Sequence, residues 1–219
     1  MTAGATLFYT ENESGSWIGN SISISDADDI ELASGVVKIS SGHTAGDVLE
    51  LTTQNGISGS YDSSTGVLSV SGTATEYEYK IALRFVTYHS TSDDPTITAD
   101  DRTISWIVVD ANSENLDAET SIAVTSTIVI TPTNNPPVMT AGATLAYMEH
   151  ESARVIDNSI SISDVDDIEI ASGTISISSG HTAGDVLEFT TQNGISGSFD
   201  SAAGVLSVSG TATLAEYVT

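Results

Sequence analysis

The sequence divides at Thr131-Pro132-Thr133-Asn134-Asn135-Pro136-Pro137-Val138, because the residues before this segment begin again directly after it. Met1-Thr2-Ala3-Gly4-Ala5-Thr6-Leu7 returns as Met139-Thr140-Ala141-Gly142-Ala143-Thr144-Leu145, a period of 138 residues. When residues 139–219 are aligned on residues 1–81, 61 of the 81 positions are identical. Self-similarity at a fixed period is typical of tandem arrays. We therefore predict a complete repeat at residues 1–132, a linker at 133–138, and the N-terminal part of a second repeat at 139–219.

The linker also interrupts regular structure. Pro136 and Pro137 have no N–H group to donate to a strand ladder, and Asn134-Asn135 favours a turn. The chain starts at a repeat boundary and stops inside a repeat, so we expect it to be an excerpt of a larger protein.

Charge and composition limit the classes of partner. Thirty Asp and Glu residues against five Lys and Arg residues give a formal net charge of −25. This balance argues against nucleic acid or an anionic membrane surface as a partner, since both are recognised by clustered cations. No apolar run approaches the length of a membrane span, so membrane insertion is not expected. Two explanations of the acidity stay open, namely solubility in a salty medium and cation binding.

The absence of cysteine has a separate consequence. Disulfides and thiolate metal sites are excluded, because the sequence contains no Cys. The core, its hydrogen bonds and oxygen-bound metal remain as sources of stability.

Short alternating segments predict strands. Ser21–Ser25 and Thr174–Ser178 alternate isoleucine with serine or threonine, which places the apolar residues on one face. In Thr103–Asp110, one face carries Ile104, Trp106 and Val108 while the other is also apolar, as expected of a central strand. In Ser121–Thr131 we expect Ile122, Val124, Ile128 and Ile130 to point inward.

Turn signals separate these strands. Asn55-Gly56 is the dipeptide that most readily forms a type I′ hairpin turn, and Asp62–Gly66 predicts a second turn a few residues later. The one helical candidate is Thr75–Leu83. Short strands with turns every 8–12 residues predict an all-β fold, an antiparallel sandwich.

Four motifs in order resemble the cadherin pattern. They are Tyr9-Thr10-Glu11-Asn12-Glu13, Ser25-Asp26-Ala27-Asp28-Asp29, Val109-Asp110-Ala111-Asn112 and Asn134-Asn135-Pro136-Pro137. The segments Asn55–Asp62, Gly66–Gly72 and Ala82–Tyr88 are similar to the cadherin-like repeats of very large bacterial surface proteins and secreted adhesins. The resemblance covers the whole 138-residue unit. It implies a β-sandwich of the immunoglobulin or cadherin-like kind in tandem repeats. It also implies an extracellular location, secreted or on the cell surface, a role in adhesion, and calcium bound by acidic residues that include Asp110.

The residues themselves also favour calcium. Calcium takes six to eight oxygen ligands with flexible geometry, and Asp26, Asp28 and Asp29 crowd three carboxylates into four residues. A divalent cation would relieve the repulsion between these carboxylates. In a tandem array, ligands could also converge at the joint from Glu11, Glu13, Asn134, Asn135, Asp164 and Asp166. The alternative is a solvated acidic turn without metal.

We expect a structural spacer rather than an enzyme. In this interpretation the repeats contact their neighbours along the same polypeptide, and calcium stiffens each joint. Two alternatives stay open. The chain could self-associate into an extracellular filament, in which strands of a neighbouring chain complete the unfinished repeat. It could also bind a glycan or protein ligand through exposed aromatics around Trp17. Because Trp17 and Phe8 become Val155 and Ala146 in the second repeat, we expect them to pack at a core edge.

Overall fold

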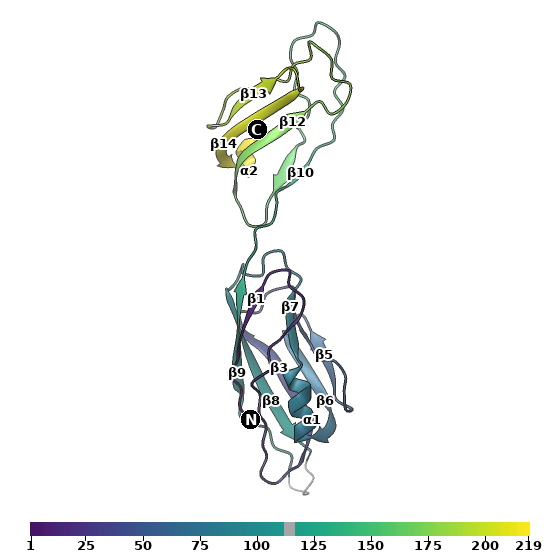
Figure 1. The fold of residues 1–219 in the computed structure, drawn as a ribbon, viewed down its shortest axis with the longest axis vertical. Coiled ribbons are helices and arrows are strands. Elements are labelled where there is room, and N and C mark those ends of the chain that lie inside the picture. Colours follow the sequence, from purple (N-terminus) through teal and green to yellow (C-terminus); the bar gives the residue numbers. More distant parts are fainter. Residues whose placement is uncertain (112–116) are drawn as a thin grey trace. The chain divides into compact units, whose positions relative to one another are not determined.

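The computed structural model describes residues 1–111 and 117–219 of the chain. It divides into two compact units, Met1–Thr133 and Asn134–Thr219 (Figure 1). Strands account for 43% of the residues and helices for 6%, and most of the strand pairs are antiparallel. The prediction of an all-β fold is confirmed at this level.

The elements follow one another along the chain in a regular order. In the first unit they are β1 (Thr6–Thr10), β2 (Ser16–Trp17), β3 (Glu31–Ser41), β4 (Asp47–Glu50), β5 (Ser58–Asp62), β6 (Val67–Thr75), α1 (Glu76–Arg84), β7 (Thr87–Ser90), β8 (Asp101–Asp110) and β9 (Val124–Thr131). In the second unit they are β10 (Val138–Thr140), β11 (Ser161–Ser163), β12 (Glu169–Ser176), β13 (Ser196–Asp200), β14 (Val205–Thr213) and α2 (Leu214–Tyr217).

Two sheets make up the first unit. The larger sheet has the order β1-β9-β8-β3-β6-β5, and the smaller one has the order β2-β7-β4. All neighbouring strands are antiparallel except β1 and β9, which run parallel. Strand β8 lies between β3 and β9, so the expectation that Thr103–Asp110 is a central strand is confirmed.

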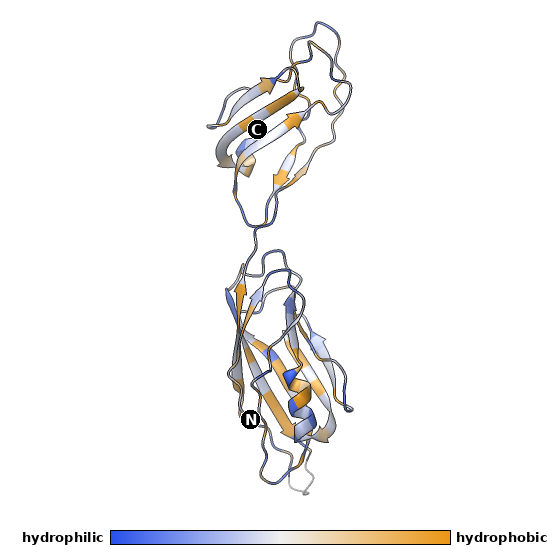
Figure 2. Ribbon diagram, in the orientation of Figure 1, coloured by the Kyte–Doolittle hydropathy of each residue, from blue (hydrophilic) through white to orange (hydrophobic). Residues whose placement is uncertain are grey.

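One hydrophobic cluster joins the inner faces of these two sheets. It contains Val37, Trp106 and Ile128 from the larger sheet together with Leu49 and Tyr88 from the smaller one. Alternation along β8 buries every second residue, in agreement with the strand period of two. Figure 2 shows the apolar residues along β8 and its neighbouring strands.

The predicted hairpin turn forms as expected. Asn55 and Gly56 both have positive φ angles, 51° and 78°, which is the requirement of a type I′ turn. Asn193 and Gly194 repeat this geometry in the second unit, with φ angles of 50° and 78°. The local sequence is sufficient to explain the turn in both places.

Helix α1 begins at a capping box. The Thr75 hydroxyl accepts a hydrogen bond from the Glu78 N–H, and the Glu78 carboxylate accepts one from the Thr75 N–H at 3.0 Å. Tyr79, Ala82 and Leu83 form the buried face of the helix. The predicted helical segment is confirmed, and Thr213 with Glu216 builds the same box before α2.

The capping box predicts a specific acid sensitivity. Hydrogen bonds from the Thr75 backbone and then the Thr75 side chain lower the pKa of Glu78. A carboxyl group with a lowered pKa stabilises the fold above its unfolded pKa and loses that contribution as the pH falls through the folded value. We therefore expect the wild-type first unit to lose more stability between about pH 6 and pH 3 than the Glu78→Gln variant.

Tryptophan fluorescence measures this loss in the first unit alone, because the only two tryptophans are Trp17 and Trp106. Urea titrations of the wild type and of Glu78→Gln at both pH values give the comparison. Equal acid-induced losses in wild type and Glu78→Gln would contradict the prediction.

Two strand predictions are wrong in the first unit. Ser21–Ser25 forms only an isolated bridge between Ser23 and Thr2, although Ile22 is buried and Ile24 is half-buried as the alternation requires. The last strand begins at Val124 rather than Ser121, and Ile122 is exposed instead of pointing inward. Hydrogen bonds explain this start, because Ser121 bonds to the Val108 backbone through its N–H and its hydroxyl.

The second unit has two small sheets. Strands β10 and β11 form a pair, and the other sheet has the order β12-β14-β13. This order and its register repeat β3-β6-β5, including a bulge that lies between Leu32 and Ser34 in β3 and between Ile170 and Ser172 in β12. The buried cluster consists of Ile195, Leu206, Val208 and Ala212, far fewer residues than in the first unit.

Candidate functional site

The first Asp-x-Asp-Asp motif is a backbone-capping turn. Oδ1 of Asp26 accepts hydrogen bonds from the N–H groups of Ala27 at 2.7 Å and of Asp28 and Asp29 at 3.4 Å. The N–H of Asp26 donates to the Glu76 carboxylate at the start of α1. An aspartate in this position mimics a backbone turn, so the first acidic residue of the motif has a structural reason.

The second acidic residue of the turn experiences the charge of the first. A side-chain hydrogen bond with Asp26, followed by repulsion from its charge, raises the pKa of Asp28, whereas the same hydrogen bond lowers the pKa of Asp26. Both side chains are exposed. The pair therefore carries closely spaced negative charge that a cation would offset.

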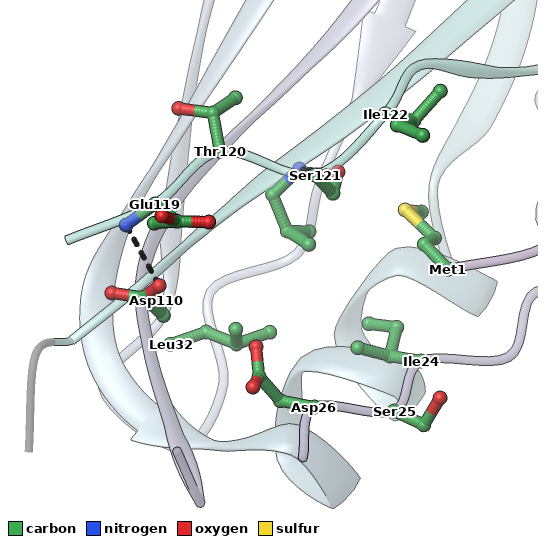
Figure 3. Close-up of a pocket in the computed structure, with 11 residues that line it drawn as sticks. Met1, Ile24, Ser25, Asp26, Leu32, Asp110, Glu119, Thr120, Ser121 and Ile122 are labelled. Carbon is green, nitrogen blue, oxygen red and sulfur yellow. Dashed lines mark hydrogen bonds between the residues drawn. The ribbon is translucent and has the colours of Figure 1, made fainter. Parts of the chain in front are cut away.

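Asp26 and Asp110, two of the predicted ligands, line the same cleft at one end of the first unit. The cleft has a volume of about 280 Å³. Figure 3 shows Asp110 and Glu119 at one side of it and Met1, Ile24 and Ile122 at the other, with Asp26 between them. The Glu119 N–H donates to Oδ2 of Asp110 at 2.7 Å. Asp28 does not line this cleft.

Glu11 binds the backbone where the chain leaves the first unit. It is buried, with 3% of its surface exposed, and its Oε2 accepts a hydrogen bond from the Thr133 N–H at 2.9 Å. Glu13 behaves differently, because its carboxylate turns back to the Thr10 N–H of its own turn at 3.2 Å. The two predicted glutamates are therefore not equivalent, and Glu11 is the one that contacts Thr133, the first residue of the linker.

The second acidic turn, Asp164–Asp167, binds the backbone where the chain enters the second unit. Oδ1 of Asp164 accepts hydrogen bonds from the N–H groups of Asp166 and Asp167, at 3.0 and 3.1 Å, as Asp26 does in the first unit. Oδ2 of Asp166 accepts one from the Asn135 N–H at 2.5 Å. The side chain of Asn134 donates to the Asn135 carbonyl at 3.0 Å. Asp164, Asp166, Asn134 and Asn135 thus form one local hydrogen-bonded group.

The donor atoms at both acidic turns are of the kind that calcium prefers. They are carboxylate and amide oxygens, and the hydrogen bonds found for Asp164 and Asp166 engage one oxygen of each carboxylate. Within residues 1–111 and 117–219, no group of three or more Asp, Glu or His side chains has the geometry to hold a metal ion. A calcium ion here would need further ligands from backbone carbonyls, amides and water. Asn112 of the predicted Asp110 motif lies outside the described residues.

The most buried charged group was not predicted from the sequence. Asp47 and Arg102 form an ion pair whose side chains are both 0% exposed, with Nε of Arg102 2.7 Å from Oδ2 of Asp47. The hydroxyl of Tyr88 donates to Oδ1 of Asp47 at 2.7 Å, and the Thr44 N–H donates to Oδ2 at 2.8 Å. Burial, and then the hydrogen bond and charge of Asp47, raise the pKa of Tyr88.

Arg102 connects this pair to the loop that precedes β8. Its guanidinium donates to the carbonyls of Pro95 at 2.6 Å, Ala99 at 2.8 Å and Asp101 at 3.2 Å. The sequence contained a signal for this arrangement, because Arg102 shares the inward face of β8 with Ile104 and Trp106. A cation at an inward position needs a buried carboxylate, although the sequence does not say which one.

Phe8 and Trp17, whose counterparts in the second repeat are Ala146 and Val155, are exposed, and so is Phe85. Phe8 is 74% exposed, Trp17 is 58% exposed, and Phe85 is 42% exposed. The rings of Trp17 and Phe85 are in edge-to-face contact at 5.1 Å between centroids. The expectation that Trp17 and Phe8 pack at a core edge is therefore wrong. These side chains lie on the surface of the unit.

Comparison with protein-family models, with curated proteins and with solved structures gave no match. No helix within the described part of the chain is both long enough and apolar enough to cross a membrane.

Proposed function

We propose that this chain is a structural spacer of an extracellular adhesin-like protein. The observation that carries the proposal is that each unit makes a hydrogen bond to the backbone of the linker. A buried glutamate of the first unit binds the Thr133 N–H, and an aspartate of the second unit binds the Asn135 N–H. Each of these bonds lies within one unit and fixes the backbone where that unit meets the linker, which suits a repeat of an array.

The fold proposed for each repeat is a cadherin-like β-sandwich. Support comes from the two sheets of the first unit, which share one core, and from the 61 identical positions that relate the second repeat to the first. Because β1 and β9 run parallel, the chain enters the first unit at one end of this strand pair and leaves it at the other. This arrangement suits repeats that follow one another along a single chain. We propose a role that is mechanical and not enzymatic.

Calcium is the proposed stiffening ligand at the joint between successive repeats. The candidate ligands are Glu11, Asn134, Asn135, Asp164 and Asp166, with carbonyl oxygens and water completing the six to eight that calcium takes. Glu13 is the weakest member of the predicted set, because its carboxylate caps its own turn. Asp26, Asp28 and Asp110 would serve in the same way toward a preceding repeat.

This proposal predicts a calcium-dependent stability. If the affinity is in the extracellular range, a 10- to 100-fold excess of metal stabilises the bound form by about 1.4–2.7 kcal/mol. Chelation should therefore lower the melting temperature and widen the distribution of angles between the units. Calorimetry and small-angle X-ray scattering, each with calcium and with chelator, measure the two effects.

A matched pair of variants tests the assignment of the ligands. Asp164→Asn combined with Asp166→Asn should abolish the calcium response, because amides can still cap the turn but carry no charge. The corresponding change of Asp26 and Asp28 to Asn lies in the turn away from the linker and should leave the response at the joint in place. Identical melting curves and scattering profiles with calcium and with chelator would show that the acidic turns act without calcium.

A second candidate function is supported by the exposed aromatic residues. Trp17 pairs with Thr87 across β2 and β7, and Thr87 also lines a cleft of about 330 Å³ with Glu50, Leu51 and Tyr61. Aromatic rings beside a polar cleft suit glycans or protein loops. If this surface binds a ligand, Trp17→Ala should remove binding to a glycan array without changing the melting temperature. Retained binding by that variant would exclude this role for Trp17.

A further inference from the structure

Strand β12 has an open edge where its counterpart in the first unit is covered. In the first unit β3 pairs with β6 on one side and with β8 on the other. In the second unit β12 pairs with β14, and within the described residues it is the end strand of its sheet. The same strand therefore occupies an interior position in one unit and an edge position in the other.

A glycine in β12 corresponds to a close approach that only β8 makes. A Cβ atom added to Gly35 of β3 would lie 3.0 Å from the carbonyl oxygen of Ile107 in β8, which explains why this position is glycine. Its counterpart Gly173 would meet only the Val208 side chain, at an ordinary 3.4 Å. Neither glycine has a positive φ angle. The described contacts of the second unit give no reason for Gly173, whereas a strand in the place of β8 does.

An aspartate of the second unit has the same local geometry as the aspartate that binds an arginine of β8 in the first unit. Asp185 corresponds to Asp47 and accepts from the Thr182 N–H at 2.8 Å, as Asp47 does from Thr44. In the first unit the partner of this carboxylate is Arg102 of β8. The only arginine after residue 133 is Arg154, which bonds to the Ala146 carbonyl at 2.8 Å. Asp185 therefore keeps the turn geometry of Asp47 without its cation.

The apolar face beside this edge is also covered in the first unit and exposed in the second. Val37 of β3 is 1% exposed, but its counterpart Ile175 of β12 is 41% exposed. In the first unit Val37 faces Trp106 of β8 across the ladder. An isoleucine at this position would be buried by the same covering strand.

We propose that the open edge of β12 is an acceptor for an antiparallel strand of the β8 type, and that an arginine of this strand forms an ion pair with Asp185. The occupant is a strand with the features of residues 82–131, the part of the first repeat that supplies β8 to cover β3. A second copy of this chain is a poor donor, because its own β8 is already covered on both sides and its Trp106 and Arg102 are fully buried. Transferring that strand would open one edge in order to close another.

The test extends the full chain by a copy of residues 82–131 placed after Thr219. Asp157 occupies the position of Gly19 in the second repeat, and a Cβ atom at Gly19 would come within 2.2 Å of the Leu83 carbonyl. Both the extended chain and the 219-residue chain therefore carry Asp157→Gly, so that the added copy of Leu83 has room. We expect the β12 amides that do not bond to β14 to exchange at least about tenfold more slowly in the extended chain. Hydrogen exchange followed by mass spectrometry or NMR gives the comparison.

Two substitutions separate strand addition from general stabilisation. Gly173→Val should leave exchange in the 219-residue chain unchanged and remove the slowing in the extended chain. Asp185→Asn should act in the same way, because an incoming arginine would lose its ion pair. Gly35→Val in the first unit is the matched control, and it should speed exchange of β3 in both chains.

Three results would overturn the proposal. The first is equal exchange of β12 in the extended and 219-residue chains. The second is an extended chain whose slowed exchange survives Gly173→Val. The third is protection of β12 in the 219-residue chain that rises with protein concentration, which would assign the edge to a second copy.

Discussion

Arg102→Met should destabilise the first unit by about 3–5 kcal/mol, because it leaves the carboxylate of Asp47 buried without its cation. The substitution also removes the donors that hold the carbonyls of Pro95, Ala99 and Asp101. The methionine side chain fills most of the vacated volume, so the loss reports the charge and the hydrogen bonds rather than a cavity. Urea denaturation followed by tryptophan fluorescence measures the change in the free energy of unfolding.

The second unit supplies the control for this experiment. Arg154 is half exposed, and it lies 3.6 Å from the Glu151 carboxylate in a surface pair. Arg154→Met, followed by circular dichroism because both tryptophans lie in the first unit, should change stability by no more than about 0.5 kcal/mol, since exposed pairs contribute little. A loss below about 1 kcal/mol for Arg102→Met would mean that Asp47 finds water or another partner in the variant.

Trp106→Ala is the second large effect, with an expected loss of about 3–5 kcal/mol in the first unit. Trp106 is 0% exposed at the centre of the larger sheet, and its Nε1 donates to the Ser126 hydroxyl at 3.1 Å. Truncation leaves a large cavity and a buried hydroxyl without its donor. Circular dichroism should follow the denaturation, because the variant loses its main fluorophore.

Trp17→Ala provides a matched comparison with the same change of residue. Trp17 lies on the surface at the edge of the smaller sheet, so its replacement should cost no more than about 0.5 kcal/mol. The two variants differ only in burial and in the hydrogen bond to Ser126. Equal denaturation midpoints for the two variants would contradict the position assigned to Trp106.

The sequence by itself determined the local features of this protein. The Asn55-Gly56 turn, the helical segment at Thr75–Leu83 and the alternation along Thr103–Asp110 depend on residues that are close in the chain, and each was predicted. The internal repeat was equally visible, because it requires only a comparison of the sequence with itself. The calcium and spacer interpretations also came from the sequence, and they stay predictions.

Only the tertiary structure decided which distant residues meet. Asp47 and Arg102 are 55 residues apart, and no local pattern pairs one of thirty acidic residues with one of five basic ones. The exposure of Trp17 and Ile122 likewise depends on which strands cover them, since hydrophobicity alone does not distinguish a core residue from a surface one. The difference between Gly35 and Gly173 has the same origin. Identical residues in identical local structure acquire different surroundings, because packing is a property of the strands that arrive from elsewhere in the chain.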